Sequence, residues 1–394
     1  MKQVKILFLV LFSLLSLIAV SCMPGGTQPA KGWPGTAFHN GVVYTGTSGG
    51  EAVAVNSSAR NLQWSYLIAV PSSGGIMSCG QAPVSAAIYG APAAAEDLAY
   101  VGTYSGKVLA LSTSARSQDL SFPQQRYGEW EWDCPGEDAL NNGIVAGLVI
   151  EGDAIYLTSS NGRVYSLDKE FGDLNWESEI IDEEYKKLWA SPVIHGDSIY
   201  VSTFAGYVYT LSIKTGDLLP WAFKSEDGFV SAPAIYEDTL FVGSFQNSLY
   251  AIEIGSSEPL WIFPGGKWFW ATPVVHDGVV YAGCLDGKIY AVRSRTGEKI
   301  WEFEAGSPIV SSPVLMDDLL LVADESGNLY VFALDAKPVD NEAIPLRTIQ
   351  INAPVKGSFC AQEGMAYVRA QNNRLYTLDI ENGRINWELP LAIE

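Results

Sequence analysis

The chain has few of the residues from which catalytic and metal centres are usually built. Among its 394 residues there are three histidines and five cysteines, and no two cysteines are adjacent. The pattern H-E-x-x-H, which places two zinc ligands and a general base on one helix, does not occur. These absences disfavour a zinc hydrolase and leave few candidates for nucleophilic or metal-assisted catalysis.

Positive charge is also scarce. The chain carries 24 Lys and Arg against 44 Asp and Glu, which gives a formal net charge of −20. If Lys2 and Lys5 are removed with an N-terminal signal, this becomes −22. A surface so acidic repels phosphate backbones and anionic headgroups. We therefore expect neither nucleic acid nor an anionic lipid surface as a partner.

Long apolar runs are missing except at the N-terminus, where Lys2 and Lys5 precede an apolar run from Ile6 to Val20. That run is shorter than the roughly 20 residues of a spanning helix, and the small residues after it are typical of a secretory signal. Cys22 follows them, in an order that resembles a bacterial lipobox. We predict a lipoprotein signal peptide over 1–22, lipidation of Cys22 and a flexible Pro/Gly-rich tether over 23–31. An ordinary cleaved signal with a stray cysteine is the alternative.

The rest of the chain, 32–394, is an array of repeats. Stretches of eleven residues that end in Trp recur, as in 166–176, 251–261, 291–301 and 377–387. Each follows a small-residue/Pro pair, a polar turn and an apolar run. One residue of that run aligns across eight units, and we call it the landmark: Tyr44, Tyr100, Tyr156, Tyr200, Phe241, Tyr281, Leu321 and Tyr367. Each unit has four short strand patterns separated by Gly/Asp/Asn turns. We predict an all-β, eight-bladed β-propeller of four-stranded antiparallel blades in one domain, without a strand exchanged between its ends.

The pattern A-x-[DN]-x-x-T-G-x-x-x-W resembles the tryptophan-docking signature of the pyrroloquinoline-quinone (PQQ) type propeller repeat. The resemblance covers about 32–390 and implies that each Trp packs between neighbouring blades. The corresponding residues are Trp64, Trp176, Trp221, Trp261, Trp301 and Trp387. In blade 2 the docking residue is either Trp130 or Trp132, and blade 7 has no Trp at all.

Four cysteines remain after Cys22. The repeat alignment places Cys79 and Cys134 in the two connections that flank blade 2, on the same face. We therefore predict a Cys79–Cys134 disulfide, and buried free thiols at Cys284 and Cys360.

The alignment also argues against a metal centre. His39, His195 and His276 each lie five residues before a landmark, so they occupy one equivalent turn on three separate blades. They cannot share one metal ion, because zinc ligands lie about 2.0 to 2.3 Å from the metal.

The best candidate site is a ring of residues eleven positions before the landmarks. We call it the mouth ring: Trp33, Tyr89, Val145, Trp189, Val230, Trp270, Val310 and Lys356. Trp268 and Phe269 stand beside Trp270, and acidic loops follow blades 2 and 3. Aromatic platforms rimmed by acids suit a sugar, a cationic ligand or an extended peptide. The alternative is that these aromatics only plug the funnel.

The repeat family implies two functional classes. Quinoprotein dehydrogenases share the blade number and docking motif, but they carry an adjacent Cys-Cys pair that this chain lacks. The chain is more similar to non-catalytic exported propellers, among them the lipoprotein of the outer-membrane β-barrel assembly machinery. We expect no cofactor and no enzyme activity. We predict a monomeric, membrane-tethered extracytoplasmic scaffold that binds a protein, peptide or sugar at its mouth face. A PQQ-dependent dehydrogenase and a cell-surface carbohydrate binder are the alternatives.

Overall fold

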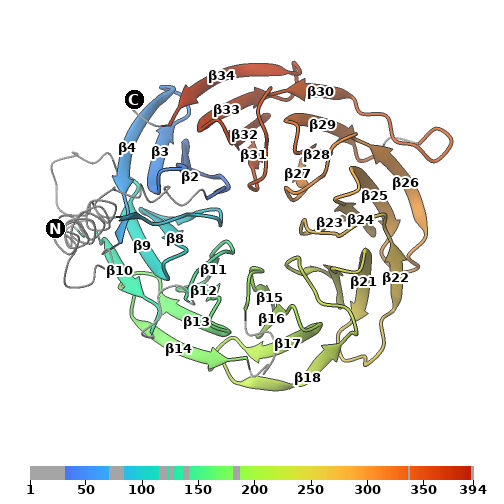
Figure 1. Ribbon diagram of the computed structural model, residues 1–394, viewed down its shortest axis with the longest axis horizontal. Helices are drawn as coiled ribbons and strands as arrows, with labels where there is room; N and C mark the ends of the chain where they lie inside the picture. The colour runs from blue at the N-terminus through green and yellow to red at the C-terminus, as the bar shows by residue number, and fades with distance from the viewer. Residues whose placement is uncertain are drawn as a thin grey trace, which may run out of the picture.

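Alternating apolar strands and tight turns close into a ring of eight blades in the computed structural model (Figure 1). The structure describes residues 32–70, 84–114, 123, 128–135, 142–180, 187–335 and 338–391. Within these ranges every blade is a four-stranded antiparallel sheet built from consecutive strands, which confirms the predicted eight-bladed propeller. The predicted signal peptide, Cys22 and the tether lie outside the described residues.

The strands fall into four concentric layers. The innermost strands are β1 (Ala37–His39), β7 (Ala93–Ala95), β11 (Val149–Glu151), β15 (Val193–His195), β19 (Ala234–Tyr236), β23 (Val274–His276), β27 (Val314–Met316) and β31 (Cys360–Gln362). The second strands are β2 (Val42–Gly46), β8 (Leu98–Gly102), β12 (Ala154–Thr158), β16 (Ser198–Ser202), β20 (Thr239–Gly243), β24 (Val279–Gly283), β28 (Leu319–Ala323) and β32 (Met365–Ala370). The third strands are β3 (Glu51–Asn56), β9 (Lys107–Ser112), β13 (Arg163–Asp168), β17 (Tyr207–Ser212), β21 (Ser248–Glu253), β25 (Lys288–Arg293), β29 (Asn328–Ala333) and β33 (Arg374–Asp379).

The outer strands form the perimeter of the disc. They are β4 (Asn61–Leu67), β10 (Trp130–Asp133), β14 (Leu174–Glu179), β18 (Leu218–Lys224), β22 (Trp261–Pro264), β26 (Lys299–Glu304), β30 (Arg347–Gln350) and β34 (Arg384–Pro390). One further hairpin, β5 (Ala69–Val70) with β6 (Val84–Ser85), lies in the connection from blade 1 to blade 2. No helix long and apolar enough to cross a membrane occurs in the described part of the chain.

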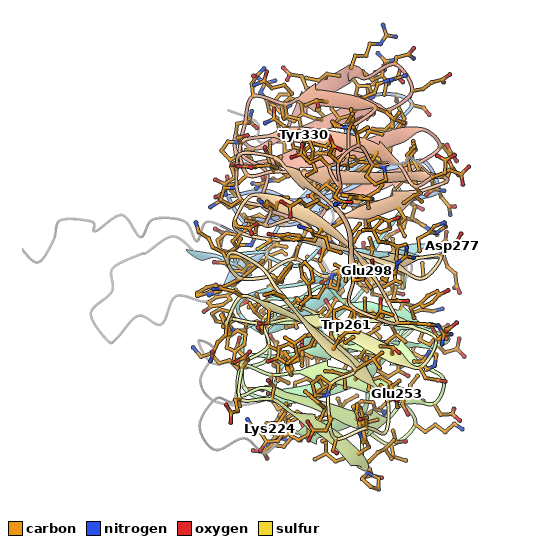
Figure 2. All side chains as sticks on the ribbon, turned by 90° about the vertical axis from the view of Figure 1, so that its right-hand side faces the viewer. Lys224, Glu253, Trp261, Asp277, Glu298 and Tyr330 are labelled. Carbon is orange, nitrogen blue, oxygen red and sulfur yellow. The ribbon has the colours of Figure 1, made fainter. Side chains whose placement is uncertain are left out.

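The second and third strands carry the core because both of their faces are covered by neighbouring blades. In β24 and β25 the central residues are buried, while the inner and outer strands are only partly so. The turn between strands one and two needs left-handed backbone, as Asp277 (φ 46°) and Gly278 (φ 74°) show in blade 6. Figure 2 shows the disc edge-on, with Asp277 and Lys224 on opposite faces. The outer strands therefore end on one face, and these turns lie on the other.

Two of the tryptophans predicted to dock blades, Trp176 and Trp261, contact the Thr-Gly turn of the next blade. The Nε1–H of Trp176 donates to the carbonyl oxygen of Ile213 over 3.1 Å, and that of Trp261 donates to Ser294 over 2.8 Å. The indole lies on a glycine: a Cβ at Gly216 would stand 2.3 Å from Cε3 of Trp176. Gly216 is thus required both by its positive φ and by the ring that covers it.

The structure shows which residue takes the docking position in blades 2 and 7, where the repeat pattern left this open. In blade 2 it is Trp130 that takes the docking position, because its Nε1–H donates to Lys169 O over 3.1 Å and its ring covers Gly172. In blade 7 an arginine replaces the tryptophan. Arg347 pairs with Val331, the register that Trp301 has with Ala291 in blade 6. Its Nε donates to Glu381 O over 3.0 Å, and its side chain lies over Gly383.

The ring closes between blades 8 and 1 by packing and by hydrogen bonds of the backbone and the side chain of Thr36. Thr36 donates its backbone N–H to Ser358 O over 3.0 Å, and its hydroxyl donates to Tyr367 O over 2.7 Å. The rings of Phe38 and Tyr367 stack with centroids 4.9 Å apart. Because β1 to β4 all come from one continuous segment, no strand is exchanged between the two ends, as predicted.

Candidate binding site at the mouth of the central channel

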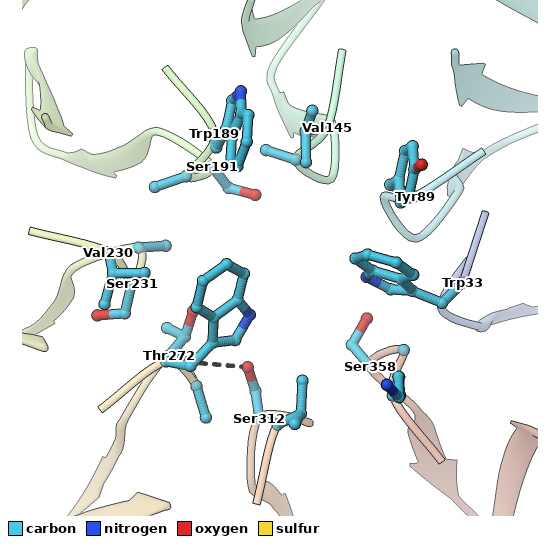
Figure 3. A pocket seen from close by; sticks show the side chains of 18 of the residues that line it. Trp33, Tyr89, Val145, Trp189, Ser191, Val230, Ser231, Thr272, Ser312 and Ser358 are labelled. Atoms are coloured by element: carbon cyan, nitrogen blue, oxygen red, sulfur yellow. Dashed lines mark hydrogen bonds between the residues drawn. The ribbon is translucent and has the colours of Figure 1, made fainter. Parts of the chain in front are cut away.

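The mouth ring assembles as the repeat alignment predicts. All eight of its residues line one cavity of about 310 Å³ on the channel axis (Figure 3): Trp33, Tyr89, Val145, Trp189, Val230, Trp270, Val310 and Lys356. They do not lie within the inner strands but just before them; Trp33, for example, precedes β1 by four residues. Residues far apart in the sequence are therefore brought to one circle, on the face where the outer strands end.

Alternation along these segments decides which side chains reach the cavity. The residue before each mouth-ring position is buried between blades, as Ile88, Leu188 and Ile309 are. Phe269 holds this position in blade 6, is fully buried and packs against Phe263 and Tyr290. The prediction that Phe269 contacts a ligand is therefore wrong, because in an extended segment the side chains on either side of Trp270 point away from it.

The aromatic members of the site form two chains of edge-to-face contacts. On one side Trp33, Tyr89 and Tyr104 follow each other with centroid separations of 4.7 and 5.4 Å. On the other side Trp189 contacts Phe204 at 5.2 Å, and Phe204 contacts Phe245 at 5.0 Å. Such T-shaped pairs are the favoured geometry of aromatic rings. The rings therefore brace each other around the opening.

Three of the rings in these chains, Tyr104, Phe204 and Phe245, are not among the predicted site residues. Tyr104, Phe204 and Phe245 all lie four residues after a landmark, in the turn between the second and third strands. Ser160 and Glu325 hold the same position in blades 3 and 7. The signal was present in the alignment, but these residues look like ordinary turn residues until the fold places the turn beside the mouth.

Trp268 extends the site outward. It is 41% exposed, and the edge of its ring meets Phe245 with centroids 5.0 Å apart. Together with Trp33, Trp270 and Lys356 it lines a second hollow of about 370 Å³ beside the axial cavity. The two hollows share four mouth-ring residues, Trp33, Trp270, Val310 and Lys356.

One ion pair joins blades 7 and 8 at the mouth. The Lys356 ammonium stands 2.6 Å from a carboxylate oxygen of Glu325, which is the only described carboxylate that lines either hollow. Below the ring, hydroxyls belong to the fold: Ser191 donates to Gly147 O, and Ser312 accepts the backbone N–H of Thr272 over 3.1 Å (Figure 3). Burial raises the pKa of Tyr89, so it is a neutral hydroxyl at physiological pH.

We predicted that acidic residues of the loops after blades 2 and 3 surround the mouth. Those of them that follow here and that the structure describes lie elsewhere. Glu131 and Asp133 lie on β10, on the perimeter, where both pair with Lys107. Glu179 on β14 pairs with Arg163. Outer strands end far from the axis, so acids on them cannot surround an axial ligand. Glu137, Asp138 and the acids at 182–184 lie outside the described residues.

The three histidines stand apart from this site. His39, His195 and His276 lie in the inner-strand turns on the opposite face of the disc. His39 Nε2 is 3.1 Å from Glu96 O. Among the described residues no group of His, Cys, Asp and Glu is arranged to hold a metal ion. Residues 46–50 match the pattern G-x-S-x-G, but they run from the last residue of β2 to the residue before β3, and the element that follows is a strand and not a helix.

The cysteines differ from the predicted pairing. Cys134 is a free thiol, buried between blades 2 and 3, and Cys79 lies outside the described residues. The sequence placed the two connections on one face, yet the side chain of Cys134 turns into the interface. Cys284 is free and buried, as predicted, and Cys360 is free and partly buried. Burial raises the pKa of all three thiols to about 12.

Comparison with known proteins identifies similar chains. A family profile described as outer membrane protein assembly factor BamB matches residues 26–263 and 264–342. Among solved structures, BamB from Moraxella catarrhalis is similar with a TM-score of 0.64 and 14% identity, over 86% of this chain and 93% of that one. The computationally designed Ika8 protein gives 0.63 and 13%, over 87% and 94%. Identities this low show a shared fold alone. No curated protein sequence matches the chain.

Proposed function

Because the chain belongs to the family of the outer membrane protein assembly factor BamB, we propose that it is a non-catalytic scaffold that binds a protein partner at the mouth of its propeller. The observation that carries this proposal is the braced aromatic surface around the channel. Trp33 is 36% exposed and Trp268 41% exposed, although both belong to chains of ring contacts. Rigid, half-exposed Trp and Tyr side chains are the residues that dominate protein–protein interfaces.

The charges around the mouth favour a polypeptide over a cationic ligand. Lys187 Nζ lies 5.8 Å from the ring centroid of Trp189, and Lys267 and Lys356 line the second hollow. The aromatic faces that would attract a cation are therefore accompanied by lysines, and one carboxylate, Glu325, is already paired. A neutral or acidic extended segment can use the aromatic rings without that repulsion.

The lipid anchor fixes the orientation of the scaffold in this proposal. Lipidation at Cys22 leaves a tether of 23–31, and a fully extended chain spans at most about 3.3–3.6 Å per residue, so the tether reaches roughly 30 Å. The tether joins the propeller directly before Trp33, which is a mouth-ring residue. The mouth is thereby held close to the extracytoplasmic surface of the membrane, where a membrane-bound partner would meet it.

Isolation of the intact lipoprotein in mild detergent, followed by identification of its neighbours, tests the proposal. Trp268→Ser removes an exposed ring at the mouth, and Leu260→Ser is the matched control, because Leu260 is 46% exposed next to β22 on the perimeter. We expect a partner that is retained by wild type and by Leu260→Ser but lost from Trp268→Ser. Equal retention by both variants would contradict the proposal.

Two further measurements separate the alternative functions. Titration with PQQ and calcium, followed by the quinone absorbance, would reveal a dehydrogenase by saturable binding. Binding to a glycan array that is lost in Trp270→Ala would replace the protein partner with a carbohydrate.

A further inference from the structure

The outer strands of a propeller each present one unpaired edge, and such edges invite pairing with other chains unless they are protected. Seven of the eight outer strands carry a charged residue or a proline within the strand. The exception is β4, whose seven residues Asn61–Leu67 contain neither. Its edge lacks the two commonest devices that prevent strand addition.

The outer edge of blade 6 provides an example of such an edge that is paired with another segment of the same chain. On β26, Glu302 donates its backbone N–H to Asn341 O over 3.1 Å and accepts the N–H of Ala343 over 3.0 Å. This makes a parallel bridge between Glu302 and Glu342. The segment 341–343 comes from blade 7, from the connection between β29 and β30 that reaches over β26 (Figure 1). A short extended segment thus pairs with the outer edge of blade 6.

Ser65 on β4 is the equivalent of Glu302. Each directly follows its docking tryptophan, and Ser65 pairs with Val53 as Glu302 pairs with Tyr290. Ile68 donates its N–H inward to Gly50 O over 3.1 Å, which fixes the alternation of the strand. In an antiparallel pair every second residue turns its backbone groups away from its partner. The N–H and C=O groups of Ser65 and Leu67 therefore face outward, and within the described part of the chain they meet no partner.

We propose that the outer edge of β4 is a docking site for an extended segment of a partner polypeptide, which pairs with Ser65 and Leu67 through backbone hydrogen bonds as 341–343 pairs with Glu302. The segment would be uncharged over the paired residues, because β4 offers no charge to match one. Leu67, 51% exposed, provides an apolar contact for it. This surface lies on the perimeter, so the inference is independent of the proposed function of the mouth.

Two other blades of the propeller carry a proline at the position where a substitution would block the edge of β4. Blades 5 and 8 carry a proline three residues after the docking tryptophan, at Pro264 and Pro390. Leu67 holds that position in blade 1. Leu67→Pro therefore removes one outward N–H at a site where two other blades already accommodate proline. Leu67→Ala is the matched control, since it removes the side chain and keeps the N–H.

The probe is a synthetic eight-residue peptide of alternating valine and threonine, with a backbone N-methylated twin. Binding to the intact protein is followed by fluorescence anisotropy, and hydrogen exchange is measured over 61–70. We expect binding that protects this segment from exchange, becomes at least tenfold weaker in Leu67→Pro, persists in Leu67→Ala and fails with the methylated twin. Thermal unfolding confirms that both variants fold.

Four results would overturn the proposal. Absence of peptide binding, or equal binding to wild type and Leu67→Pro, would show that the edge does not accept a strand. Equal binding of the methylated twin would show that backbone pairing is not involved. A wild-type dimer in sedimentation that Leu67→Pro abolishes would assign the edge to a second copy of this chain instead of a partner.

Discussion

The tryptophans of this propeller form two populations that differ in what surrounds the indole. At the blade interfaces Trp261 lies on Gly297, beside Phe241, with its N–H bonded to Ser294. At the mouth Trp33 contacts Tyr89 by one ring edge and leaves a third of its surface to solvent. The same residue type therefore serves cohesion in one layer and recognition in the other. The difference lies in how far the neighbouring blade covers the ring, which for Trp261 is done by Gly297.

The strongest test of this difference is Trp261→Ala. We expect a loss of about 2–3 kcal/mol in the free energy of unfolding, because Trp261 is partly buried between blades 5 and 6 and the substitution removes most of that apolar contact. Trp261→Phe keeps most of the ring and loses the hydrogen bond to Ser294, at a cost of about 1 kcal/mol for that bond. Urea unfolding monitored by circular dichroism measures both. A loss below 1 kcal/mol for Trp261→Ala would remove the distinction between the two populations.

The thiol of Cys284 tests whether the blade interface is dry. Burial raises its pKa from 9.0 to about 12, so the thiolate fraction below pH 9 is about a thousandfold smaller than in the unfolded chain. We expect native protein to be inert to a charged disulfide reagent at pH 8 and to react fully in guanidinium chloride. Because the Cys284 thiol has a higher pKa in the folded protein than in the unfolded chain, its contribution to the stability of the folded state is fully present below about pH 9. That contribution is lost as the pH rises toward 12. Rapid labelling of native protein would contradict a sealed interface.

Arg347 sharpens the comparison because it holds a docking position without an aromatic ring. Its hydrogen bond to Glu381 O and its packing over Gly383 join blades 7 and 8. Both groups are solvent-accessible, so we expect Arg347→Ala to cost only about 1 kcal/mol. Arg347→Lys, which keeps the charge and loses the geometry of the Nε donor, should behave like the alanine variant. If it matched wild type, the charge and not the directed bond would hold this interface.

The smallest effect on stability is expected at the mouth. Trp189→Ala and Trp270→Ala should leave the melting temperature within a few degrees, because both rings border an open cavity. Partner binding should weaken in both, as measured by retention of the partner in detergent. A large drop in melting temperature would instead assign these residues to the core, and the mouth would then be a plugged funnel.

Much of this arrangement follows from the sequence, since the repeat spacing fixes register and register fixes position on the ring. The eight mouth-ring residues lie eleven positions before Tyr44 and its equivalents, so the repeat alignment alone predicts them. Phe269 was misplaced because residue type alone does not give the phase of an extended segment. Arg347 was missed because a long cation and an indole share no pattern, although both can cover a glycine and donate one hydrogen bond. The pairing of Cys134 depended on side-chain direction within a long connection, which repeat alignment does not determine.

The uninterrupted course of blade 1 has a mechanical consequence. Both ends of the described propeller meet at the junction of blades 8 and 1, and any load carried by a tether would reach the ring through Gly32 and Thr36. In propellers whose last strand is shared between the termini, such a pull is opposed by a whole sheet. Here it is opposed by the buried apolar cluster that blades 8 and 1 share and by the hydrogen bonds of Thr36. The ring is therefore closed without a shared strand, and this closure lies beside Gly32, the first described residue of the propeller.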